Sequence, residues 1–222
     1  MRADWFVPAL AAHVPRLAQQ LAIDCRIARP AVALTFDDGP HAEGTPAVLD
    51  VLAQRGATAT FFLVGEQVRA HRALAREIAD AGHEIALHGD RHTLLLRRRV
   101  AELADDLRRA TAELEDTTGR TPALYRPPYG VFSAGALALV RSLGLVPLLW
   151  SRWGRDWERR ATPSKIAARA TRGLRPGDVV LLHDSDAYSS SGSWSRTAAA
   201  LPSVIDAIAD LDVPAVSVTQ ST

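Results

Sequence analysis

The sequence contains a single cysteine, Cys25, among its 222 residues. One thiol forms neither a disulfide within the chain nor a zinc site built from several cysteines, so a bound metal would need histidine, aspartate or glutamate. Neither charge is in excess, since 26 Lys+Arg face 25 Asp+Glu, and this argues against a nucleic-acid partner. No apolar run reaches the ~18 residues of a membrane-spanning helix. The remaining composition, 47% hydrophobic and 23% charged, is that of a globular domain.

The N-terminal segment also lacks the features of a signal peptide. Asp4 and Pro8 interrupt it, and no clean small-residue cleavage site follows an uncharged core. We therefore expect a cytoplasmic location, with secretion as the alternative. Residues 1–30 are predicted to form a helical extension that packs on the domain. The amphipathic part of this extension is Trp5 to Ile23, and a peripheral membrane contact of that part is the second interpretation. The protein is expected to be a monomer.

From residue 31 to residue 222, short β-rich runs alternate with helical patterns such as Val68–Ala81 and Val100–Thr118. Several of the runs are almost continuously apolar, as strands buried on both faces are. This alternation predicts the α/β class, as a single-domain distorted (β/α)7 barrel related to the TIM barrel, with an open doubly wound sheet as the alternative. The candidate strands are Ala31–Phe36, Ala57–Val64, His83–His88, Ala123–Arg126, Leu145–Trp150, Asp178–His183 and Val213–Val218.

Polar residues cluster where five of these candidate strands end. In a parallel barrel the carboxyl ends of all strands meet on one face, where loops build active sites. We therefore predict a site from residues on separate strands: Asp37, Asp38, His88, His92, Arg126, Asp156 and His183.

A metal centre is predicted within this group. Asp38, His88 and His92 supply one carboxylate and two imidazoles, a set that leaves positions open for water and substrate, as in catalytic metal sites. Asp37 precedes Asp38 in a tight Asp-Asp-Gly-Pro turn, so the two adjacent carboxylates point in different directions. One carboxylate can then bind the metal while the other faces the attacking water.

These residues resemble the five ordered motifs of the NodB-homology polysaccharide deacetylases, carbohydrate esterase family 4. The resemblance covers roughly residues 31 to 220. The motifs are Thr35-Phe36-Asp37-Asp38-Gly39-Pro40, His88-Gly89-Asp90-Arg91-His92, Arg126-Pro127-Pro128-Tyr129-Gly130, Asp156-Trp157 and Leu181-Leu182-His183.

The resemblance implies a role for each matching residue. Asp38, His88 and His92 would bind a divalent metal, zinc first, with cobalt or nickel as alternatives. Asp37 would be the general base and His183 the general acid, with Arg126 orienting Asp37 and Asp156 in turn holding Arg126. The backbone N–H of Tyr129 would stabilise the oxyanion. The residues predicted to contact substrate are Leu181, Trp157, Pro127 and Trp153.

Two positions depart from the family pattern. Gly89 stands where the family usually has Ser or Thr, and Trp153 stands where it often has an acid. Trp150, Trp153 and Trp157 are interleaved with arginines, and aromatic faces stack on sugars while guanidinium groups bind carboxylate or phosphate. This predicts an acylated amino sugar that carries an anionic group; the competing interpretation is a solvated surface over a packed barrel rim. The arginines are Arg152, Arg155, Arg159 and Arg160.

The sequence therefore predicts a metal-dependent enzyme that removes an N-acyl group, with acetyl as the first expectation, from an amino sugar of a polysaccharide or glycoconjugate. Three alternatives remain. They are an O-acetyl esterase acting on polysaccharide, a deformylase of a lipid-linked amino sugar, and a catalytically silent sugar-binding module.

The low-complexity stretch Ser185–Ser195 is predicted to be a mobile surface loop.

Overall fold

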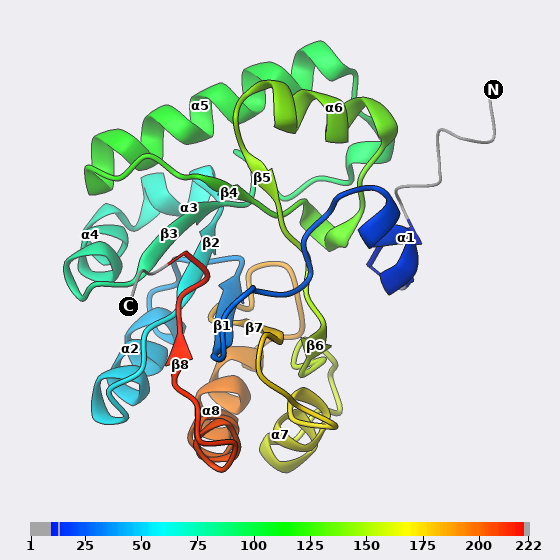
Figure 1. Ribbon diagram of the computed structural model, residues 1–222. Helices are drawn as coiled ribbons and strands as arrows, with labels where there is room; N and C mark the ends of the chain where they lie inside the picture. The colour runs from blue at the N-terminus through cyan, green and yellow to red at the C-terminus, as the bar shows by residue number, and fades with distance from the viewer. Residues whose placement is uncertain (1–9, 13, 220–222) are drawn as a thin grey trace.

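The computed structural model describes residues 10–12 and 14–219. Its centre is one parallel sheet in the order β5-β4-β3-β2-β1-β7-β6, with β8 paired to β1 beside this path. Figure 1 shows the helices around the outside of the curled sheet, so the predicted parallel arrangement is confirmed. The strands are β1 (Val32–Asp37), β2 (Thr60–Leu63), β3 (Glu84–Leu87), β4 (Leu124–Tyr125), β5 (Val146–Pro147), β6 (Arg152–Trp153), β7 (Val179–His183) and β8 (Ala215–Val216).

The helices cover the sheet through apolar faces. In α5 the inward positions Leu103, Leu107, Ala110 and Leu114 recur at helical spacing and are all buried. The helix ends at Gly119, whose φ of 66° suits glycine, as the sequence predicts. The helices are α1 (Pro15–Gln20), α2 (Gly44–Gln54), α3 (Gly65–Ala70), α4 (Arg72–Asp80), α5 (Val100–Thr118), α6 (Ala134–Ser142), α7 (Pro163–Ala170) and α8 (Ser193–Ala209). None of these helices is long and apolar enough to cross a membrane.

Two predicted elements are divided in the structure. The helix expected over Val68–Ala81 is broken at His71, whose φ of −134° and ψ of 48° separate α3 from α4. The apolar spacing continues across the break, from Val68 to Ala75, which hides it in the sequence. The strand expected over Leu145–Trp150 pairs only at β5, and the chain then crosses to the opposite end of the sheet to form β6.

The crossing from β5 to β6 spans the open side of the barrel. Within residues 14–219 the sheet path stays open between these two strands, and the segment 24–27 lies along the opening. Asp24 forms a parallel bridge with Leu148, and Arg26 forms an antiparallel bridge with Asp178. Part of the predicted amphipathic stretch, residues 5–9 and 13, lies outside the described residues; in the described part, Ala18 of α1 is buried in the core.

Candidate active site

A cavity of about 290 Å³ opens at the carboxyl ends of the strands. Register explains why the predicted residues meet there, because β1 pairs with β7 so that Asp37 lies opposite His183. Arg126 and Asp156 are fully buried behind the cavity surface. The predicted site residues that line the cavity are Asp37, Asp38, His88, His92, Tyr129, Trp153, Trp157, Leu181 and His183. Pro127 is buried and outside this lining, which does not fit the substrate contact predicted for it.

The three predicted metal ligands lie together. The Nε2 atoms of His88 and His92 are 3.4 and 3.3 Å from Oδ1 of Asp38, and one ligand atom from each residue falls within 4.8 Å of the others. Asp38 has a φ of 79°, a left-handed conformation that turns its carboxylate away from that of Asp37. The three residues thus present two nitrogens and one oxygen to a common point, as the sequence predicts.

Protonation in this cluster suits a cation. Oδ1 of Asp38 is buried and has no hydrogen-bond partner among the described residues, a costly state unless an ion is bound. Nδ1 of His88 donates to the carbonyl oxygen of Arg126 at 2.7 Å, which leaves the lone pair of the neutral ring on Nε2. Burial lowers the pKa of His92 to about 4. Burial opposes ionisation of Asp38, but the close approach of His88 and the charge of His183 lower its pKa to about 2. Two neutral imidazoles and a carboxylate are the forms that bind a divalent metal.

Asp37, beside the metal cluster, is held by a buried arginine. Nη1 of Arg126 donates to Oδ1 of Asp37 at 2.6 Å and to Oγ1 of Thr35 at 2.9 Å. The same guanidinium also donates to the carbonyl oxygens of Leu148 and Leu149, so it has little freedom to rotate. The second oxygen of Asp37 is 3.9 Å from Nε2 of His88. Asp37 therefore keeps one oxygen on Arg126 and turns the other toward the cluster.

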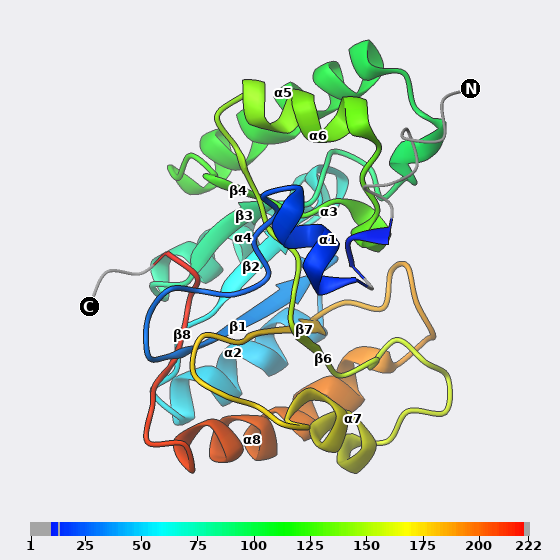
Figure 2. The same cartoon turned by 45° about the vertical axis from the view of Figure 1, so that its right-hand side comes forward.

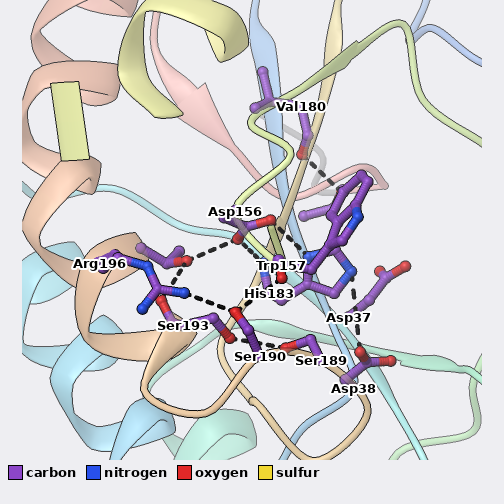
Figure 3. A network of polar contacts seen from close by, with 12 residues as sticks. Asp37, Asp38, Asp156, Trp157, Val180, His183, Ser189, Ser190, Ser193 and Arg196 are labelled. Atoms are coloured by element: carbon purple, nitrogen blue, oxygen red, sulfur yellow. Dashed lines mark hydrogen bonds and ion pairs between the residues drawn. The ribbon is translucent and has the colours of Figure 1, made fainter. Parts of the chain in front are cut away.

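The structure corrects the partner predicted for Asp156. Asp156 does not hold Arg126; its Oδ1 accepts from Nδ1 of His183 at 2.8 Å, and its Oδ2 accepts from the backbone N–H of His183 at 2.7 Å (Figure 3). The hydroxyl of Thr197, on α8, donates to the same Oδ2 at 2.7 Å. The order of the motifs along the chain could not distinguish these two partners. Asp156 thus forms a buried ion pair with His183, separate from the pair of Asp37 with Arg126.

This ion pair sets the charge of His183. Burial alone would lower the pKa of the imidazole, but the charge and hydrogen bond of Asp156, with the charges of Asp38 and Asp37, raise it to about 10. Because Nδ1 is engaged by Asp156, the Nε2–H points to the cavity, where it lies 4.0 Å from Oδ2 of Asp38. His183 is therefore a protonated donor beside the metal cluster.

The surface loop predicted at Ser185–Ser195 is corrected in part, because Ser193–Ser195 belong to α8 and Ser185 is buried; its mobility stays a prediction. The segment forms hydrogen bonds: Ser190 donates to the carbonyl oxygen of Trp157, and Ser189 pairs with Ser193. Ser193 itself is the first residue of α8 and is buried. Polar side chains in this segment bond to one another and to the neighbouring loop, which low complexity in the sequence does not show.

Tyr188, in the same segment, is a site residue that the sequence did not indicate. Its ring stacks on that of His92, with centroids 4.3 Å apart and planes 10° apart. Tyr129 contacts the same His92 ring edge-on, with centroids 4.6 Å apart. The Tyr188 hydroxyl donates to Glu66 at 2.5 Å and accepts from Gln67 at 3.1 Å. The sequence signal for this contact is weak, since Tyr188 is one of two aromatic residues, with Trp194, in a serine-rich stretch. Tyr129 lies at a turn with a φ of 62°, and its oxyanion role stays a prediction.

Three tryptophans form the wall beside His183. The ring of Trp157 contacts His183 edge-on, with ring centroids 5.3 Å apart. The centroid of Trp153 lies 5.5 Å from that of Trp157, and the centroid of Trp150 lies 5.7 Å from that of Trp153. The arginines interleaved with them do not line this cavity. Arg155 forms an ion pair with Glu158, and Arg159 and Arg160 are exposed. The predicted anionic contact of these arginines is therefore not made inside the active-site cavity.

Comparison with known proteins places this geometry in a family. A family model described as polysaccharide deacetylase matches residues 26–148. A chitooligosaccharide deacetylase of Bradyrhizobium sp. (strain ANU 289) is 39% identical over 154 residues, which cover 69% of this chain and 70% of that protein. A peptidoglycan-N-acetylglucosamine deacetylase of Bacillus cereus is 33% identical over 177 residues, covering 78% of this chain and 79% of that protein.

Solved structures agree with the sequence comparison. A peptidoglycan N-acetylglucosamine deacetylase in complex with 4-naphthalen-1-yl-N-oxidanyl-benzamide superposes with a TM-score of 0.83 at 28% identity, covering 90% of this chain and 92% of that chain. A family 4 carbohydrate esterase from Streptomyces lividans in complex with acetate gives a TM-score of 0.75 at 30% identity, covering 85% and 92%. The predicted (β/α)7-type barrel is thereby confirmed. This chain belongs to the polysaccharide deacetylase family, carbohydrate esterase family 4.

Proposed function

We propose that this protein is a metal-dependent deacetylase that hydrolyses the N-acetyl group of an amino sugar in a polysaccharide or glycoconjugate. The observation that carries the proposal is the arrangement of two separate ion pairs around one cluster of metal ligands. Arg126 with Asp37 forms one pair and Asp156 with His183 forms the other, and Asp37 and His183 each lie within about 4 Å of a metal ligand. Sugar binding alone requires neither a base nor an acid at these positions, so the arrangement favours an enzyme over a silent module.

The residues divide the reaction between them. A divalent metal held by Asp38, His88 and His92 would polarise the amide carbonyl and make water more acidic. Asp37 accepts a proton from the attacking water as the oxygen–carbon bond forms. His183 gives its Nε2 proton to the sugar nitrogen as the carbon–nitrogen bond breaks, so the products are acetate and a free amino group.

Zinc is the metal we propose for this centre. Two imidazole nitrogens and one carboxylate oxygen are a ligand set that zinc accepts while keeping positions open. Cobalt and nickel accept the same donors, and metal analysis of the purified protein distinguishes the three. The cytoplasmic location and the monomeric state expected from the sequence stay predictions.

The relatives support N-acetylglucosamine as the sugar to test first. Both sequence relatives described above carry names that specify deacetylation of chitooligosaccharide or of peptidoglycan N-acetylglucosamine. The N-linked acetyl group is also consistent with His183, because an amine leaving group requires a proton more strongly than an alcohol does. We therefore propose the amide rather than an ester as the preferred bond.

Release of acetate or formate from four substrates tests this proposal. Zinc-loaded protein is incubated with N-acetylchitooligosaccharides, peptidoglycan fragments, acetylated xylan and an N-formylated amino sugar. We expect acetate from the first two, and none with Asp37→Asn although this variant retains zinc. Asp50→Asn provides the matched control, because Asp50 is an exposed residue of α2. Acetate released only from xylan would indicate an esterase instead, and formate as the only product would indicate a deformylase. If the protein binds zinc but turns over none of the four substrates, it is a silent module.

A further inference from the structure

A second cavity, of about 710 Å³, adjoins the active site. It shares Trp150 and Trp153 with the active-site cavity, so these two side chains stand between the two spaces. One of its walls is formed by α1 with the segment 22–26, and the other by β6 with Arg175. Figures 1 and 2 both place α1 beside the crossing from β5 to β6. The cavity therefore follows the open side of the barrel.

Two of the arginines that line this cavity share one buried acid. Nη1 of Arg26 lies 2.5 Å from Oδ1 of Asp178, and Nε of Arg152 lies 3.0 Å from Oδ2. Asp178 is fully buried, whereas 42% of the Arg26 side chain is exposed. One carboxylate balances only one of the two guanidinium groups, so this pair contributes a net positive charge to the cavity wall.

Two further arginines add to this charge. Arg16 and Arg175 are exposed, and neither side chain has an ion-pair or hydrogen-bond partner among residues 10–12 and 14–219. Among the lining residues Asp24 is the one acid, and it is also exposed; Asp178 lies buried behind the wall. The lining thus has four arginines and one aspartate, and with the buried Asp178 the balance is four positive groups to two negative ones. Arg16 and Arg175 are the two guanidinium groups available to bind an anion.

The tryptophans connect this cavity to the reaction centre. The series Trp157, Trp153 and Trp150 begins in contact with His183 and ends in the lining of the second cavity. Aromatic faces of this kind stack on the apolar faces of sugar rings. A saccharide whose acetamido group lies near His183 can therefore extend along the tryptophans toward the arginines.

The wall formed by α1 lies outside the part of the chain that the family model matches, which begins at residue 26. It nevertheless packs against the active site. A Cβ placed on Gly130 would lie 2.4 Å from the ring of Trp150 and 3.2 Å from Cβ of Ala12, so the N-terminal segment contacts the turn that carries Tyr129. The second cavity is thus built by an element additional to the matched domain and is joined to the catalytic face.

We propose that this cavity is a subsite for an anionic group, a phosphate or a carboxylate, on the substrate next to the N-acetylated sugar. Guanidinium groups bind both oxyanions through paired N–H donors, and Arg16 and Arg175 are the groups with no competing acid. This inference rests on the proposed function for the acetylated sugar, and it names the class of substrate that the enzyme selects.

Calorimetric titration of the metal-free protein tests the subsite without turnover. The probes are N-acetylglucosamine 1-phosphate, a disaccharide of N-acetylglucosamine and glucuronate, and the neutral methyl glycoside of N-acetylglucosamine. We expect at least one anionic probe to bind more tightly than the neutral one. In Arg16→Gln/Arg175→Gln, its affinity falls by about fivefold or more, whereas the affinity for the neutral probe changes by less than about twofold. High salt removes the difference between probes.

The control variant is Arg99→Gln/Arg120→Gln, which removes the same charge at two exposed arginines outside both cavities. The subsite is supported if only the cavity variant weakens anion binding, and the phosphate and glucuronate arms then identify the anion. It is refuted if neither anion binds more tightly than the neutral probe, or if both variants weaken binding equally. Acetate release by the zinc-loaded protein is measured separately, so an inactive enzyme that still binds the anion contradicts the proposed function and leaves the subsite established.

Discussion

Replacing Asp156 with asparagine should disable the general acid while leaving the metal ligands in place. Asp156 is fully buried, and its two oxygens accept from Nδ1 and from the backbone N–H of His183. Asparagine is similar in shape but carries no charge, and its amide nitrogen cannot accept either hydrogen bond. Burial then acts on His183 opposed only by the charges of Asp38 and Asp37, so its pKa falls from about 10 toward or below the ordinary value of 6.5.

The size of the effect follows from this change in protonation. At the ordinary histidine pKa of 6.5, only about a tenth of His183 would be protonated at pH 7.5, against essentially all of it in the parent protein. Positioned acid catalysis contributes roughly 10²- to 10⁴-fold to such reactions, so we expect kcat/KM of Asp156→Asn to fall within that range. Residual activity should rise as the pH is lowered toward 6, because protonation then returns.

The stability of the variant has a predictable dependence on pH. A histidine whose pKa is raised on folding stabilises the folded state fully below the unfolded pKa, and this contribution disappears as pH rises through the folded pKa. Asp156→Asn should therefore lose a few kcal/mol of unfolding free energy at pH 6 and progressively less toward pH 10. Urea unfolding of the metal-free protein at several pH values measures the difference.

NMR titration of the imidazole of His183 in metal-free protein provides the direct assay. Thr197→Val serves as the control, because it removes one hydrogen bond to Oδ2 of Asp156 and keeps the charge. It should lower kcat/KM by less than about tenfold. If His183 still titrates near pH 10 in Asp156→Asn, or if both variants lose the same activity, Asp156 does not hold the acid in its charged form.

Three further predictions concern other parts of the molecule. Asp38→Ala should reduce zinc bound per chain from about one to near zero in elemental analysis, because it removes one of three ligands; equal zinc in variant and parent would refute the predicted centre. Tyr188→Ala should weaken zinc affinity by roughly tenfold in a chelator competition, since the ring of Tyr188 stacks on His92, whereas Tyr188→Phe keeps the ring and should change it by less than about threefold. His83 is buried, and burial lowers its pKa to about 4. Between about pH 7 and pH 4 the unfolded state therefore takes up a proton that the folded state does not. The free energy of unfolding should fall over this range by up to about 3 kcal/mol. His83→Gln should flatten this acid limb in chemical unfolding, and an unchanged slope would show that His83 is not its source.

The sequence allowed the fold and the metal ligands to be predicted for a common reason. Strands such as β1 and β7 are buried on both faces, so their apolar runs are unambiguous and their carboxyl ends can be located to within a residue. Asp38 and His183 follow or close such runs, which fixes the face on which they meet. The α5 helix was predicted at its observed bounds because its apolar spacing and its glycine cap agree.

Contacts between loops could not be predicted in this way. Asp156 and Tyr188 lie in segments without periodic apolar patterns, and their partners, His183 and His92, are distant in sequence. Position along the chain identified Asp156 as a functional residue but not the side chain that it holds. Gly89 shows the opposite case, since its φ of 98° explains why glycine can stand at this departure from the family pattern.

The two buried ion pairs explain how one cavity can hold a base and an acid at the same time. Asp37 and Asp156 are both buried carboxylates, but they have different partners: Arg126 cannot release a proton, and His183 can. The first pair therefore leaves the second oxygen of Asp37 available to a water proton. The second pair makes His183 a stored proton source beside the leaving group. Exchanging these two partners would leave the net charge of the site unchanged but would abolish the division between base and acid. The chemistry of the site is therefore determined by the partner of each aspartate more than by the presence of the two aspartates.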